Sequence, residues 1–250
     1  MTPDEPDAQP GRMAELVGAL GAVRSRIADA CAAARRDPRS ITLIAVTKTY
    51  PASDVATLVR LGLLDLGESR DQEAAAKVVE TAELLAGVPD LSGPPRWHFV
   101  GQLQRRKSRS VATYAASVHS VDRAELVTSL ADAVGAVDRP RLDVFVQVSL
   151  DGDPDRGGVV AADVPALAEV IAGRAQLRLR GVMAVAPMDA DPDAAFADLA
   201  EVAARLRADH PEADAISAGM SADLEAAVRH GATHVRVGTA LLGRRPPAFG

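Results

Sequence analysis

The sequence predicts an α/β fold: a single (β/α)8 barrel of the TIM type with an extra N-terminal helix. Two observations lead to this prediction. Eight short apolar, β-rich runs recur along the 250 residues, and amphipathic helical patterns separate them. Continuous apolar strands that alternate with helices imply a parallel sheet covered by helices, and eight such units match a closed barrel better than an open sheet.

The expected elements follow in chain order. Residues 1–11, MTPDEPDAQPG, are acidic and rich in proline and contain no apolar run, so they resemble a disordered tail rather than a signal peptide. A helix is expected over about residues 12–36, with Cys31, the only cysteine, buried in it. We expect residues 12–250 to form one domain, because no shift in composition marks a second. The expected strands cover residues 41–48, 63–69, 97–102, 117–122, 142–150, 177–186, 214–220 and 234–243.

Helix signals lie between these strands. In SDVATLVRLG an apolar face follows a candidate cap at Ser53 or Asp54. In DVPALAEVIAG, Asp163 precedes Pro165 at the start of a second apolar stripe. The acidic run at 189–193, DADPD, is interpreted as a loop that leads into a further helix.

Composition narrows the classes of function. The chain is 48% hydrophobic but only 3% aromatic, so Val, Leu, Ile and Ala must build its core. A net charge of -6 argues against general nucleic-acid binding, because neutralising phosphates needs a positive surface. No uncharged apolar run approaches membrane-spanning length. We therefore expect a soluble cytoplasmic protein with neither nucleic acid nor membrane as a partner.

No metal site is expected either. The single cysteine excludes a multi-cysteine metal site as well as an internal disulfide. Asp151, Asp153 and Asp155 have the spacing of a calcium loop. However, Arg156 and Ala162 stand where such a loop needs a glycine and a bidentate glutamate.

A lysine ends the first expected strand, in LIAVTKTYP. An ammonium group at the mouth of an apolar strand loses hydration, which is unfavourable unless a partner compensates or the charge is given up. Lys48 is therefore either an ion-paired or snorkelling residue or a functional one. In a barrel it would lie at the C-terminal end of a strand, where barrels carry their functional residues.

The last two strands are followed by glycine-containing segments, SAGMSADLEAA and RVGTALLG. Barrel phosphate sites are commonly built by these two loops. Gly219, Ser221, Gly238 and Thr239 could supply hydroxyls and unobstructed amides to a phosphate, and Ser221 could cap a helix that begins near Ala222. Ordinary glycine turns are the alternative.

Two further residues have open roles. Arg236 lies two residues before Gly238, so it projects to the same side of its strand and can point into the barrel. A buried ion pair with a carboxylate is the alternative. His98 could contact a ligand, although an isolated histidine is more often a hydrogen-bonded structural residue.

Six segments carry a resemblance to a known family. They are LIAVTKTYP, LGESRDQEAAAK, WHFVGQLQRRK, VHSVD, RGVMAVAP and SAGMSADLEAAVRHGATHVRVGTALLGRR. In this order, over roughly residues 12–245, they resemble the pyridoxal phosphate homeostasis protein family, relatives of the barrel domain of alanine racemase. The resemblance implies a barrel that binds pyridoxal 5'-phosphate (PLP).

The resemblance also implies roles for single residues. Lys48 would form a Schiff base with PLP, and Arg236 would face the pyridine nitrogen, keeping it unprotonated because a guanidinium remains charged. Asparagine is usual in the family where Ser69 and Arg106 stand, and Ser69 is a shorter polar side chain near the expected cofactor ring. The implied cofactor-binding residues are Lys48, Ser69, Met183, Ser217, Gly219, Ser221, Arg236, Gly238 and Thr239. Of these, the residues implied to surround the phosphate are Ser217, Gly219, Ser221, Gly238 and Thr239.

The implied function is that of a non-catalytic carrier, which holds PLP reversibly, takes part in intracellular PLP homeostasis and supplies apo-enzymes. A PLP-dependent racemase-like enzyme is the alternative, and a cofactor-free Schiff-base aldolase is a third class. The chain ends soon after the eighth strand, without the β-rich domain that gives racemases an opposing tyrosine base. Since two-face proton transfer needs an opposed acid-base pair, we expect a carrier without catalytic residues.

Overall fold

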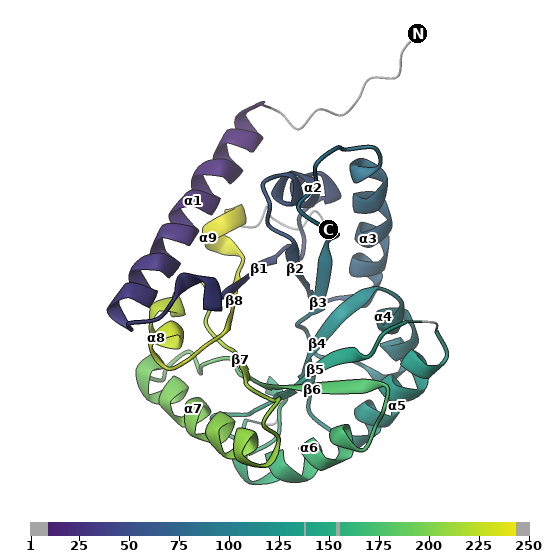
Figure 1. The fold of residues 1–250 in the computed structure, drawn as a ribbon, viewed down its shortest axis with the longest axis vertical. Helices are drawn as coiled ribbons and strands as arrows, with labels where there is room; N and C mark the ends of the chain where they lie inside the picture. The colour runs from purple at the N-terminus through teal and green to yellow at the C-terminus, as the bar shows by residue number, and fades with distance from the viewer. Residues whose placement is uncertain (1–9, 138, 154–155, 244–250) are drawn as a thin grey trace.

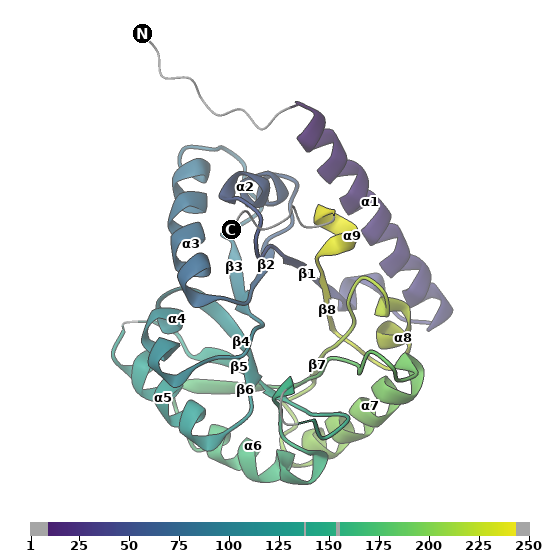
Figure 2. The ribbon, with the colours of Figure 1, turned by 180° about the vertical axis from the view of Figure 1, so that it is seen from behind.

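The computed structural model describes residues 10–137, 139–153 and 156–243. Within these residues, eight parallel strands close into a barrel in the order β1 to β8, with β8 pairing back onto β1 (Figures 1 and 2). The predicted barrel is therefore confirmed. The strands are β1 (Thr42–Val46), β2 (Asp65–Glu68), β3 (Arg96–Phe99), β4 (Ala115–Val121), β5 (Leu142–Gln147), β6 (Leu177–Met183), β7 (Ala215–Ser217) and β8 (His234–Val237).

Helices form the outer ring of the barrel (Figure 1). No helix in the described ranges has the length and apolar character needed to cross a membrane. The α-helices are α1 (Pro10–Ala33), α2 (Ala52–Arg60), α3 (Asp71–Leu85), α4 (Ser108–Tyr114), α5 (Ala124–Gly135), α6 (Val164–Ala172), α7 (Pro192–Asp209), α8 (Leu224–Arg229) and α9 (Thr239–Leu242). Single 3-10 turns are η1 (Pro38–Ser40), η2 (Arg105–Lys107) and η4 (Ala161–Asp163).

The extra N-terminal helix covers the side of the barrel where the chain closes. α1 runs beside α8 and α9, next to the β8–β1 seam (Figures 1 and 2). Leu16, Leu20, Val23 and Cys31 of α1 are buried in the apolar cluster under this side, which confirms the predicted burial of Cys31. The helix begins at Pro10, two residues before its predicted start at residue 12. Residues 1–9 of the expected tail lie outside the described residues.

Two helix starts bear on the predicted caps. The expected Ser53 or Asp54 cap of α2 is wrong, because Pro51 is the N-cap residue and Asp54 lies within the first turn. The Asp54 carboxylate instead accepts from the Arg12 guanidinium, with Nη2 2.7 Å from Oδ2, and so joins α1 to α2. By contrast, the acidic run at 189–193 leads into α7 as predicted, although the helix already begins at Pro192, with Asp191 as its cap.

The strands end earlier than predicted at their carboxyl ends, most clearly in β8. The apolar run expected to stay extended through residue 243 leaves the sheet after Val237 and forms α9. Leu241 and Leu242 are buried in the same cluster as α1, so their apolar character serves helix packing rather than a strand. A short apolar run does not distinguish these two cases by periodicity.

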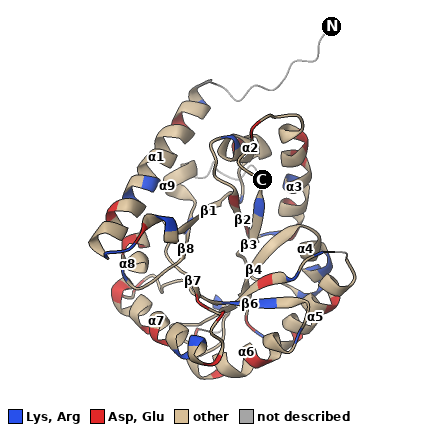
Figure 3. Ribbon diagram, in the orientation of Figure 1, with Lys and Arg blue, Asp and Glu red and all other residues tan. Residues whose placement is uncertain are grey.

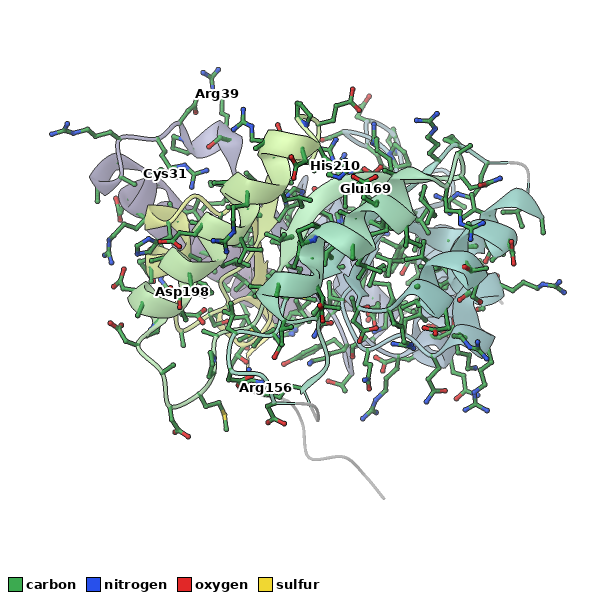
Figure 4. The ribbon with its side chains drawn as sticks, turned by 90° about the horizontal axis from the view of Figure 1, so that it is seen from below. Cys31, Arg39, Arg156, Glu169, Asp198 and His210 are labelled. Carbon is green, nitrogen blue, oxygen red and sulfur yellow. The ribbon has the colours of Figure 1, made fainter. Side chains whose placement is uncertain are left out.

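The barrel has two distinct ends. Arg39, just before β1, and Arg156, in the loop after β5, lie at opposite ends of the molecule (Figure 4). Because all strands run in parallel, the end that carries Arg156 gathers the loops that follow the strands. Charged residues of both signs are spread around the outer helices (Figure 3). The functional residues of such barrels lie in the loops that follow the strands, which here form the Arg156 end.

Candidate functional site

Lys48 lies two residues after the end of β1, is half-buried, and belongs to the turn that leaves this strand. In the β1–β8 pairing Ile44 lies beside Arg236, and in the β1–β2 pairing Val46 lies beside Gly67. Side chains alternate along a strand, so Ile44 and Val46 share the face on which Arg236 is buried, and Lys48 lies in the turn that follows them. The two residues expected to serve one ligand therefore belong to neighbouring strands of the barrel, one in the turn after β1 and one within β8.

Arg236 is held inside the barrel by neutral oxygen atoms. Nη1 donates to Ser217 Oγ at 2.6 Å, and Nη2 donates to the Ala184 carbonyl at 2.8 Å. Neither contact is the buried carboxylate that the sequence left open as a partner. Burial lowers the pKa of Arg236 to about 10, so the guanidinium keeps its charge at neutral pH. A fixed positive charge thus faces the interior.

The two glycine loops meet at the ends of β7 and β8. The Ala240 amide donates to Ser221 Oγ at 3.2 Å, and the Arg236 amide donates to the Gly219 carbonyl at 2.9 Å. The expected role of Ser221 as a cap near Ala222 is wrong, because α8 begins at Leu224 with Asp223 as its N-cap residue. The hydroxyl of Ser221 joins the two loops instead.

Glycine is required at Gly219 for two reasons. Its φ of +89° lies in the left-handed region, and a Cβ built there would lie 2.6 Å from the Ala227 Cβ. The loop therefore passes close over α8. Gly238 and Thr239 lie in the other glycine loop, at the start of α9. Gly238 is partly exposed and Thr239 is exposed. These positions leave both residues accessible to a ligand.

Met183 and Ser69 lie on other sectors of the same end. Met183 is the last residue of β6, is buried, and lies beside Ser217 in the β6–β7 pairing. Ser69 follows β2 and lines a cavity of about 450 Å³. Arg106 lines that same cavity. The two positions that depart from the family pattern, separated in the sequence, are thus brought to one place.

A buried polar chain behind Arg236 was not predicted. Ser217 Oγ, which accepts from Arg236, lies 2.8 Å from Nδ1 of His119, a residue with no exposed surface. Ser217 can donate its single proton to this nitrogen, which leaves the His119 proton on Nε2. Burial, first of all, holds the pKa of His119 well below its ordinary value, with the charges of His98, His234 and Arg236 acting in the same direction.

This series of hydrogen bonds continues towards the other end of the barrel. Nε2 of His119 lies 2.9 Å from Ser117 Oγ, which is 2.7 Å from Nδ1 of His98. Nε2 of His98 lies 2.9 Å from Asp65 Oδ1, and Arg96 pairs with the same carboxylate. With a proton on Nε2 of each imidazole, every donor in this series of hydrogen bonds has an acceptor. His98 is confirmed as a hydrogen-bonded structural residue.

The sequence contains a pattern that indicates these buried, hydrogen-bonded side chains. Ser117 and His119 are two residues apart on β4, as His234 and Arg236 are on β8, so each pair faces the barrel interior. Polar residues with a period of two inside otherwise apolar strands indicate a polar interior. Barrel interiors are more commonly filled with bulky apolar residues.

Known proteins share both the sequence and the fold of this chain. Residues 19–246 match the family model of the alanine racemase N-terminal domain. A pyridoxal phosphate homeostasis protein from Mycobacterium tuberculosis H37Rv is 50% identical over 248 residues, which cover 95% of this chain and 96% of that protein. The chain belongs to the pyridoxal phosphate homeostasis protein family.

Other family members extend the comparison. The Escherichia coli K12 pyridoxal phosphate homeostasis protein is 37% identical over 236 residues, covering 93% of this chain and 98% of that protein. The structure of PipY from Synechococcus elongatus with PLP bound is 33% identical, with a TM-score of 0.72, and covers 87% of this chain and all of that one (100%). The family thus includes a barrel of this fold with PLP bound.

Proposed function

We propose that this chain binds PLP reversibly and takes part in intracellular PLP homeostasis and supply to apo-enzymes, as a carrier. One observation carries the proposal: β1, which leads into the turn with Lys48, pairs with β8, which carries the buried Arg236 and leads into one of two glycine loops joined through Ser221. The homeostasis role named for the relatives and the PLP-bound PipY structure support it.

The residues fit this cofactor by their chemistry. PLP supplies an aldehyde that condenses with a primary amine, an aromatic ring with a basic nitrogen, and a phosphate. Lys48 offers the amine, and Arg236 offers a charged donor that favours an unprotonated ring nitrogen. Met183, beside Ser217, would flank the ring, whereas the cavity that Ser69 lines includes none of the other residues implied for the cofactor.

The phosphate would be held by Gly219, Ser221, Gly238 and Thr239. Their hydroxyls and amides are neutral donors, which bind a doubly charged phosphate well at a loop junction. Ser217, which the resemblance placed around the phosphate, has its hydroxyl engaged by Arg236 and His119. We therefore assign Ser217 to holding the guanidinium.

The carrier role is favoured over a racemase-like enzyme by the positions of the acid-base candidates. Glu68 is buried against α3, with Oε1 2.6 Å from Lys77 Nζ. His98 is buried deep in the barrel and bonded to Asp65 and Ser117. Neither side chain is placed to exchange a substrate proton at the open end, and proton exchange needs such a group within reach.

The test is the absorbance spectrum of the purified protein with PLP, before and after borohydride, followed by mass mapping of the reduced lysine. We expect the label on Lys48 and its loss in Lys48→Ala, with the fold retained. Lys77 and Lys107 are the only other lysines in the sequence, so the mapping is unambiguous. A label on either of them, or no label at all, would contradict the proposal.

Assays of α-proton exchange in deuterated water separate the carrier from an enzyme. We expect negligible exchange of amino-acid α-protons by the PLP-loaded protein. Turnover at rates typical of enzymes, about 1 to 1,000 per second, would assign it to the racemase-like class instead.

A further inference from the structure

The peptide that precedes Lys48 is tied to a buried ion cluster made by Glu68, Glu73 and Lys77. Lys77 Nζ on α3 donates to the Thr47 carbonyl at 2.7 Å. It also donates to Glu68 Oε1 at 2.6 Å and to Glu73 Oε1 at 2.9 Å. An ammonium group has three protons, so these three acceptors use its full donor capacity. Lys77 is 5% exposed and Glu68 is 1% exposed.

Thr47 makes a second contact with this cluster, and Thr49, on the other side of Lys48, makes one. Thr47 Oγ1 donates to Glu68 Oε1 at 2.7 Å. The backbone amide of Thr49 donates to Glu73 Oε1. The peptide units before and after Lys48 are therefore both anchored to charged groups from β2 and α3.

The backbone at this point is strained. Thr49 has a φ of +71°, in the left-handed region that β-branched residues rarely adopt. Such a conformation persists only where the surroundings hold it, and it is found disproportionately at functional sites. The hydrogen bond from the Thr49 amide to Glu73 holds this residue, together with the backbone hydrogen bond from the Tyr50 amide to the Thr47 carbonyl at 3.1 Å.

We propose that Glu68, Glu73 and Lys77 form a positioning cluster that fixes the turn around Lys48, so that its amine points at the aldehyde of a bound pyridoxal. This inference rests on the proposed function. The condensation joins the Lys48 nitrogen to the aldehyde carbon and releases one water, and no oxidant or reductant takes part. The cluster acts only through the position of Lys48, and its own lysine is engaged by three acceptors.

A ligand without an aldehyde separates positioning from general structural support. 4-Deoxypyridoxine 5'-phosphate has the ring and phosphate of PLP but a methyl group in place of the aldehyde. Loosening the turn should therefore affect PLP and leave this analogue unaffected. A cluster that only stabilises the barrel would affect both ligands alike.

The experiment compares Glu73→Gln with the wild type by stopped-flow absorbance for PLP and by equilibrium competition for the analogue. Because small misplacements of a reacting group cost up to about a hundredfold, we expect condensation with PLP to slow by roughly 10- to 100-fold. The affinity for the analogue should change less than about threefold. Glu80→Gln, an exposed position on the same helix, is the matched control and should behave as wild type.

Thr47→Val is a second variant, which removes only the hydroxyl that donates to Glu68. We expect the same selective slowing, and this variant decides the question if Glu73→Gln does not fold. Equal losses for both ligands, or unchanged PLP kinetics in a folded variant, would overturn the inference. If the wild type carries no reducible PLP on Lys48, the proposed function itself fails, which is a different result from a variant that behaves as wild type.

Discussion

At the scale of single residues, Arg236 shows how a buried charge is kept available. Its Nη atoms bond Ser217 and the Ala184 carbonyl, which are neutral, so no carboxylate neutralises it through these contacts. Ser217 is in turn fixed by His119. The guanidinium is thus oriented without losing its positive potential, which suits a site for an anionic cofactor.

The phosphate assignment leads to a prediction for Ser221 and Thr239. In the double variant Ser221→Ala and Thr239→Val, PLP should bind at least about a hundredfold more weakly, because each neutral donor to a charged oxygen contributes roughly 1.5 to 3 kcal/mol. Pyridoxal, which lacks the phosphate, should bind nearly as before. Equilibrium dialysis with both ligands measures the difference.

Thr239→Val alone is the control for loop geometry, since Ser221 also accepts from the Ala240 amide. It should weaken the binding of PLP selectively relative to pyridoxal, at about half the free-energy effect of the double variant. Equal losses for the two ligands would place the phosphate elsewhere.

The residues predicted from the sequence are those governed by local rules. Lys48 and the Gly219 and Gly238 loops follow strand ends, and a barrel gathers strand ends at one rim. The partnership of Ser217 with His119 was not predictable in this way, because the two residues lie 98 positions apart and meet only across the closed barrel. The contacts of Glu73 and Lys77 with the Lys48 turn were not predicted, because both are made to backbone atoms of that turn.

At the scale of elements, all eight strands were predicted, but their ends were not. β7 spans only Ala215–Ser217 and the apolar run after β8 becomes α9. The second outcome depends on α1, which supplies the apolar surface that Leu241 and Leu242 cover. Local sequence does not contain that surface, so extended and helical states of the run look alike until α1 is in place.

Gly181 in β6 permits the close approach of β7. Its φ is +146°, and a Cβ would lie 1.8 Å from the Ala215 carbonyl oxygen. We expect Gly181→Ala to lower the free energy of unfolding by about 3 kcal/mol or more, since backbone must move to relieve the overlap. Urea denaturation measures the change.

Gly21→Ala is the contrasting variant, because Gly21 lies within α1 and a Cβ added there would meet nothing within 4 Å. Alanine there should raise the free energy of unfolding by roughly 0.5 to 1 kcal/mol. A neutral Gly181→Ala would show that β6 and β7 do not approach as closely as described.

At the scale of the whole molecule, the barrel encloses imidazoles where charge is disfavoured. The ring centroids of His98, His119 and His234 lie 5.2 to 6.5 Å from one another. Burial, followed by the charge of His98, lowers the pKa of His234 to about 4, and the pKa of His119 is also held well below its ordinary value. Protonation of His119 and His234 is therefore linked to unfolding.

We expect stability to fall as the pH falls from about 6.5 towards 4. In this range the unfolded chain binds protons at histidine that the folded barrel does not, so the free energy of unfolding rises with pH and is fully regained above about 6.5. For His234 the loss between pH 6.5 and pH 5 is roughly 2 kcal/mol. Urea unfolding across this range should show a smaller fall for His234→Asn, and an identical fall would contradict the assignment.

Because β1 pairs with β8, the site combines residues that are synthesised at different times. Lys48 leaves the ribosome early, whereas Arg236 and Thr239 emerge among the last residues of the barrel. No partial chain can present the amine together with the guanidinium and both loops, so capture of the cofactor reports that the ring has closed. The rate at which the visible absorbance of bound PLP appears would then report the rate of the final step of folding.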